Sequence, residues 1–221
     1  MATTYEEVRL GRTVGATGTI AEAAGSIAVI VLSIIGLAQM TASPTIVAVT
    51  VIVLGAALLA EGGALAAEFA RLVGPAGGVS SVDTEMSGMS LQVAGGGTTL
   101  VLGILALLGV ASETLSSAAL ILAGAVLLLT ASTIPQVRQL RAQAAGTSEV
   151  VQMIGRSSMT EMAGAQFLCG VAAIVLGILA LSSGSAAAAR TLILVGLLVS
   201  GGAMTVGATA MSGNLLRFFT K

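Results

Sequence analysis

The stretch from Gln166 to Leu181 reads "QFLCGVAAIVLGILAL", and the stretch from Gln92 to Leu107 reads "QVAGGGTTLVLGILAL". The two are identical at nine of sixteen positions, including the glutamine at the head and the run VLGILAL at the end. A third copy, "EAAGSIAVIVLSIIGLA", begins at Glu22, which takes the place of the glutamines. The chain therefore contains three copies of one apolar segment, and each copy begins with a polar residue.

A second apolar segment follows each copy, and these three segments also match one another. They read "VLGAALLAEGG" at 53–63, "LAGAVLLLTAS" at 122–132 and "LVGLLVSGGAM" at 194–204. Each repeat is thus an apolar segment, a short turn and a second apolar segment. Because every repeat has two segments, the three repeats run in the same direction, as parallel rather than inverted repeats. They cover approximately residues 15–72, 85–141 and 160–217 of one domain, 1–221.

The composition is that of a membrane protein. Apolar residues make up 56% of the chain and charged residues 9%, and the mean hydropathy is +1.04. A soluble domain carries about 25% charged residues. With a net charge of -1, the chain lacks the excess of basic residues that is typical of a nucleic-acid-binding protein. The single Cys169 cannot form a disulfide within the chain.

We expect an all-α integral membrane protein with six transmembrane helices, because six apolar segments approach the roughly 20 residues that a bilayer core requires. The expected spans lie near 19–40, 45–68, 91–111, 115–135, 163–183 and 189–212. Eight of the nine Arg and Lys residues fall on one side of these spans and only Arg190 falls on the other. The positive-inside rule therefore predicts cytoplasmic N- and C-termini and three short outer turns.

Two cytoplasmic linkers, approximately 70–90 and 136–162, are expected between the repeats. Parts of both linkers are expected to form short interfacial helices. So is the N-terminal stretch, in which Thr4 and Glu7 have the spacing of a capping box.

Small residues are abundant, as close helix packing in lipid requires. The series Gly95, Thr99 and Gly103 and the series Ala56, Ala60 and Ala64 each place a small residue at every fourth position. Both are predicted to lie at helix–helix contacts. The chain has no Trp, one Tyr and four Phe, so it has few aromatic anchors at the membrane interface. We therefore expect helices held mainly by one another, with membrane lipid and either further copies of this chain or other membrane subunits as partners.

The pattern of "VLGIL" at 101–105 and 175–179, a short turn such as "TASPTIVAV" with Pro44, and a second helix with Gly and Leu resembles the HdeD-type acid-resistance membrane proteins. The resemblance covers nearly all of 15–212. It implies short two-helix repeats, a stress-related role without an assigned enzymatic activity, and the inner or plasma membrane of a prokaryotic cell.

No enzyme or cofactor signature is present, so no catalytic, cofactor-binding or metal-binding residue is expected. Without His the chain has no Ser-His-Asp triad and no zinc site of the Cys/His type. The Gly-rich "VAGGGTTLVLG" lacks the Lys of a phosphate-binding loop and is interpreted as helix packing. Two Met-x-x-Met pairs, Met86 with Met89 and Met159 with Met162, offer thioether ligands for Cu(I), although methionine is more often an apolar filler.

Four polar residues form a candidate intramembrane site: Glu22, Glu61, Gln92 and Gln166. Acids within membrane spans are functional candidates by default, yet neither later repeat has an acid at the position of Glu61. Glu61 is thus either a proton or cation site or a protonated packing residue. For the glutamines, hydrogen bonds between helices are the simpler interpretation.

Two functions follow from these observations. The first is a non-enzymatic structural or accessory membrane protein that packs with itself or within a larger membrane complex. The alternative is a proton or small-solute channel or transporter that uses the intramembrane carboxylate.

Overall fold

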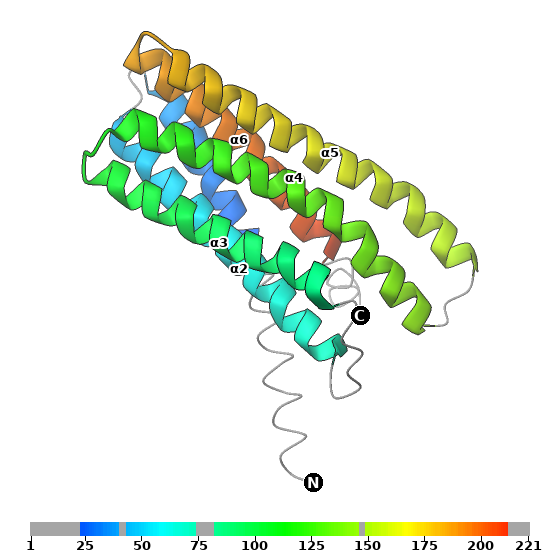
Figure 1. Ribbon diagram of the computed structural model, residues 1–221. Helices are drawn as coiled ribbons and strands as arrows, with labels where there is room; N and C mark the ends of the chain where they lie inside the picture. Colours follow the sequence, from blue (N-terminus) through cyan, green and yellow to red (C-terminus); the bar gives the residue numbers. More distant parts are fainter. Residues whose placement is uncertain (1–22, 40–42, 74–81, 146–148, 212–221) are drawn as a thin grey trace, which may run out of the picture.

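The computed structural model describes residues 23–39, 43–73, 82–145 and 149–211, with side chains described over 23–39, 43–63, 91–131, 164 and 166–206. This part of the chain is all helical, with six helices (Figure 1). They are the first helix, Ala23–Ala38, then α2 (Pro44–Val73), α3 (Val82–Leu107), α4 (Ser112–Ala145), α5 (Glu149–Ser182) and α6 (Ala186–Met211).

Three of these helices contain a segment long and apolar enough to cross a membrane. The segments are Pro44–Gly63 in α2, Ser112–Ala131 in α4 and Ala186–Val206 in α6. Within the described residues, the apolar segments of the other three helices are shorter, at Ala23–Ala38, Leu91–Leu107 and Gln166–Ser182. The prediction of a helical protein of membrane type is therefore confirmed at this coarser level.

The linkers differ from the expected separate interfacial helices. The helix α2 runs on to Val73, and α3 begins as early as Val82. In the same way α4 continues to Ala145 and α5 starts at Glu149, so these two helices extend side by side beyond the other four (Figure 1). Residues 136–145 and 149–162 thus lie in continuous long helices. The predicted capping box at Thr4 and Glu7 lies outside the described residues.

Glycine ends α3 where the chain must reverse. Gly109 has φ = 84°, in the left-handed region that favours glycine. Its N–H donates to Ala106 O at 3.1 Å, and Val110 N–H donates to Leu105 O at 3.2 Å. These two bonds form a Schellman motif, which satisfies carbonyls at the end of α3 and allows α4 to start at Ser112.

The second helices of the three repeats, α2, α4 and α6, form the centre of the bundle, because each of them contacts the other two. The largest fully buried side chains of the described residues lie mainly on these helices. They include Leu54 and Leu58 of α2, Leu120 and Leu127 of α4, and Ile193, Leu194 and Leu197 of α6. The bundle therefore has a solid aliphatic core.

Each first helix of a repeat packs against two central helices. The helix α3 contacts α2 and α4, and α5 contacts α4 and α6. The helix Ala23–Ala38 also packs against two central helices. A Cβ atom on its Gly25 would lie 2.8 Å from Ala57 Cβ of α2. On its other side, a Cβ atom on Gly201 of α6 would lie 3.0 Å from Val29 Cγ1. Three outer helices thus surround three inner ones.

The closest approaches to a backbone join helices of different repeats. A Cβ atom on Gly55 of α2 would lie 2.8 Å from Leu100 Cα of α3. One on Gly124 of α4 would lie 2.7 Å from the carbonyl oxygen of Gly170 in α5. At such positions a side chain would strike backbone, which cannot move aside as a flexible side chain can. The pairs α2–α3 and α4–α5 are therefore held by glycine at backbone contact.

The three glycines of the sequence "GGG" at 95–97 have different neighbours. A Cβ atom on Gly95 would meet Val126 of α4, whereas one on Gly96 would lie 2.8 Å from Leu59 N of α2. Gly97 has only the tip of Leu59 near it, at 3.9 Å. The Gly-rich stretch is thus a packing surface that faces two central helices at once.

One of the two predicted small-residue series is buried throughout, and the other is exposed at its first residue. Gly95, Thr99 and Gly103 are buried, as predicted. In the alanine series Ala56 is exposed, Ala60 is half-buried and Ala64 lies outside the described side chains, so the prediction is wrong at Ala56. The contact face of α2 is offset from that series and includes the adjacent Gly55 and Ala57.

We predict that Gly96→Ala destabilises the fold whereas the adjacent Gly97→Ala does not. Both substitutions gain helix propensity, worth up to about 1 kcal/mol. Only the first places a methyl group against backbone, and overpacking costs about 1–3 kcal/mol. Thermal unfolding in detergent, followed by circular dichroism, should show a lowered midpoint for Gly96→Ala alone. Equal midpoints for the two variants would contradict the backbone contact between α2 and α3.

Candidate functional site

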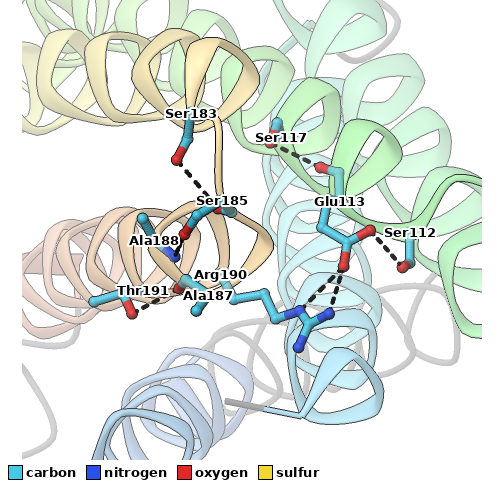
Figure 2. A network of polar contacts seen from close by, with 9 residues as sticks. All are labelled: Ser112, Glu113, Ser117, Ser183, Ser185, Ala187, Ala188, Arg190 and Thr191. Atoms are coloured by element: carbon cyan, nitrogen blue, oxygen red, sulfur yellow. Dashed lines mark hydrogen bonds and ion pairs between the residues drawn. The ribbon is translucent and has the colours of Figure 1, made fainter. Parts of the chain in front are cut away.

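Three charged residues occur among the described side chains: Glu61, Glu113 and Arg190. Two of them form an ion pair between α4 and α6, beside the short turns (Figure 2). Arg190 Nη2 donates to Glu113 Oε1 at 2.7 Å, and Nε donates to the same oxygen at 3.1 Å. The other oxygen, Oε2, accepts a hydrogen bond from Ser112 Oγ at 3.1 Å. The carboxylate is therefore fixed from both sides.

Local sequence positions this pair at two helix starts. Glu113 is the second residue of α4, where a negative charge is favoured by the helix dipole. Ser185 precedes α6, and its Oγ accepts the Ala188 N–H at 3.1 Å, as an N-cap does. The cap orients the first turn of α6, from which Arg190 reaches across to α4 (Figure 2). The positive charge is unfavourable near a helix N-terminus, and Glu113 offsets it.

A hollow lies where the three central helices begin. It is lined by the ion pair and by Pro44, Val47, Ser112, Ser116 and Ile193. The hollow is too shallow to enclose a water molecule. The hydroxyl of Ser116 is buried and has no hydrogen-bond partner within the described part of the chain. The arrangement is therefore a polar junction of helix starts rather than a ligand cavity.

Glu61 lies within α2, far along the helix from the short turns. It is buried, with 5% of its surface exposed, and it stands seventeen residues after Pro44, or about 26 Å along the helix. The helix α2 continues for twelve residues beyond Glu61, to Val73. Glu61 therefore lies within the helix rather than at either of its ends.

Gln92 and Gln166 occupy matching positions in α3 and α5, and both are buried, with 2% and 6% of their surface exposed. A Cβ atom on Gly62 would lie 3.4 Å from Gln92 Cγ, so Gln92 packs against α2 next to Glu61 in the chain. The Gln92 side-chain nitrogen is buried without a hydrogen-bond partner among the described residues. The structure thus brings Gln92 to the level of Glu61, with Gln166 at the corresponding place on α5.

The remaining candidates lie outside what the structure describes. Glu22 is outside the described residues, so its expected pairing with Glu61 stays a prediction. The side chains of the two Met-x-x-Met pairs are also outside the described set. Within that set, no group of three acidic, Cys or His side chains is placed to hold a metal ion.

The Glu113–Arg190 pair is the feature that the sequence interpretation missed. The residues are 77 positions apart, and they come from different repeats. A signal was present, because Glu113 is the only acid near the three short turns and Arg190 the only basic residue there. Two lone opposite charges at one end of an apolar bundle are expected to pair.

No protein-family model matches the chain, and neither a curated protein nor a solved structure matches it significantly. What the chain is therefore rests on its own residues. They define an all-helical protein with three helices long and apolar enough to cross a membrane.

We predict that Arg190 and Glu113 are energetically coupled. Arg190→Gln and Glu113→Gln should each lower the unfolding midpoint, because each leaves a partly buried charge without its partner. The side chains are 24% and 33% exposed, so a loss of about 1 kcal/mol is expected. The double variant should lose less than the sum of the two single losses in a thermal double-mutant cycle. Strict additivity would show that the two charges act independently.

Proposed function

We propose that the protein is a non-enzymatic, multi-pass membrane protein with a structural or accessory role, packing with itself or within a larger membrane complex. The observation that carries this proposal is the apolar outer surface of the helix bundle. The outer helices expose large apolar side chains, as on α5 from Phe167 to Leu181. A soluble protein does not leave apolar surface of this extent in water, whereas lipid accommodates it.

The interior supports a structural role. Six of the eight buried Ser and Thr hydroxyls that the structure describes bond to carbonyls of their own helix, as Thr99 does to Gly95 O at 2.8 Å and Ser200 to Gly196 O at 2.9 Å. Between the two ends of the bundle the central helices fill the axis with buried Leu, Ile and Val. Such a core favours tight packing over passage of a polar solute.

The topology is part of the proposal. We place all six helices across the membrane as three parallel two-helix repeats, with both termini in the cytoplasm of a prokaryotic cell. Eight of nine basic residues then lie on the cytoplasmic side. The proposed stress-related role rests only on the resemblance to HdeD-type proteins.

We predict that the turn before α6 is extracellular and that the α4–α5 linker is cytoplasmic. In a Cys169→Ala background, Ser185→Cys should react with a membrane-impermeant maleimide in intact cells. Thr147→Cys should react only after the cells are opened. Labelling of Thr147→Cys from outside would reverse the topology.

The structural role predicts association in the native membrane. Crosslinking in membranes, followed by gentle detergent extraction, should recover the protein with further copies of itself or with other membrane subunits. The buried Glu61 and Gln92 favour the alternative, a proton or cation pathway. That alternative predicts flux in liposomes that Glu61→Gln abolishes. A lone monomer together with Glu61-dependent flux would replace the structural role, whereas equal flux, or none in either protein, leaves Glu61 as a packing residue.

A further inference from the structure

Three contacts join one repeat to the next around the bundle. The chain connects the helices of two of them, because residues 74–81 lead from α2 to α3 and residues 146–148 lead from α4 to α5. The third contact joins α6 to the first helix, and no linker connects these two helices directly. We call it the closing contact. It depends on packing alone.

The closing contact is slightly wider than the other two at the aligned positions. The first helix has Ser26 where α3 has Gly96 and α5 has Gly170. A Cβ atom on Gly96 would lie 2.8 Å from a backbone nitrogen of α2, and one on Gly170 would lie 2.8 Å from a carbonyl oxygen of α4. At the closing contact a Cβ atom on Gly201 of α6 would lie 3.3 Å from Ser26 O. Helices in lipid associate by close backbone approach, so this difference weakens the closing contact relative to the others.

A second serine of the first helix is buried without a hydrogen bond. Ser33 stands where α3 has Gly103 and α5 has Gly177. It is fully buried, and its hydroxyl has no hydrogen-bond partner within the described part of the chain. A buried hydroxyl without a partner opposes the packing that buries it, whereas a helix that is free to move can turn the same hydroxyl to its own backbone. Ser33 therefore weakens the packing of the first helix.

The two helices beside the first helix are held more firmly. The helix α6 carries Arg190, which pairs with Glu113 of α4, and its Ile193 belongs to the buried core. The helix α2 meets α3 at backbone contact through Gly55. The first helix has no charged residue among its described residues, and it is joined to the other described helices at one end only. It is therefore the helix that can leave the bundle with the least disruption.

We propose that two copies of the protein exchange their first helices, so that each first helix packs between α2 and α6 of the other copy. The inference rests on the proposed packing of the protein with itself and specifies how the copies join. An exchange preserves the contacts, because each copy receives an identical helix. Residues 39–43 separate the first helix from α2, and an extended chain of this length spans about 20 Å. Packed helices lie about 10 Å apart, so a neighbouring copy is within reach.

The test uses the full chain with two cysteines in a Cys169→Ala background. A Cβ atom on Gly201 would lie 3.1 Å from Ile30 Cγ1, so Ile30→Cys with Gly201→Cys places two Cβ atoms within the range of a disulfide. The first helix meets the same residues on its own chain and on the other copy, so the variant favours neither state. After oxidation in native membranes, we expect mainly a disulfide-linked dimer on a non-reducing gel, which reduction returns to monomer.

A matched control spans the contact between α3 and α4, which belong to one repeat. A Cβ atom on Gly95 would lie 3.6 Å from Val126 Cβ, so Gly95→Cys with Val126→Cys should form a disulfide within one chain and run as a monomer. A second pair, Gly25→Cys with Ala57→Cys, tests the α2 side of the first helix, where the two Cβ atoms would lie 2.8 Å apart. This pair should also give the dimer.

Each other result overturns the exchange. Internal disulfides in both first-helix variants show that each chain keeps its own first helix. A linked dimer in the control as well shows that the dimer does not arise from the first helix, and the absence of any disulfide in both first-helix variants contradicts the packing of that helix. Crosslinking of the unsubstituted protein separates the two proposals. Oligomers without exchange leave the structural role in place, whereas a lone monomer without other partners overturns both.

Discussion

Backbone contact at glycine is the constraint on which the rest of the structure depends. In lipid, helices gain little from excluding water, so they associate where their backbones come close. Gly55 against Leu100 and Gly124 against Gly170 provide that approach between the repeats. Because these contacts join the second helix of one repeat to the first helix of the next, the repeats interlock. A hairpin on its own would lack most of the partners that its buried glycines contact.

The sequence predicts the elements better than it predicts their neighbours. Length and hydropathy suffice for helices, because a run of aliphatics bounded by polar residues has few other structures in a membrane. Which helix faces which depends on rotation, and a shift of one residue turns a helix by about 100°. Ala56 therefore points outward although Gly55 is in contact with α3. Gly196 shows the same limit, because it aligns with Gly55 and Gly124 in sequence yet packs against Leu120 of another central helix.

Only part of the candidate site was predicted, because the contacts between its residues also depend on how the helices are rotated and arranged. The burial of Gln92 follows from its place at the head of a small-residue stripe, which the sequence shows directly. The Glu113–Arg190 pair depends instead on how α4 and α6 are arranged around the centre, which no local pattern encodes. Their meeting also explains why a charge is tolerated near the end of an apolar segment. Each is hydrogen-bonded to the other, and the pair lies at the end of the bundle, where the polar turns are close.

The first helix shows how the repeated segment closes the bundle. Its Ser26 and Ser33 align with Gly96 and Gly103 of the second copy, so it presents bulkier residues at the contact. The glycine is then supplied by the opposite helix, because a Cβ atom on Gly201 of α6 would lie 3.3 Å from Ser26 O. Each interface keeps a short distance between the two helix backbones, but the position of the glycine that allows it changes from one interface to the next. The same apolar segment is therefore used three times, and each central helix adjusts to the copy that packs against it.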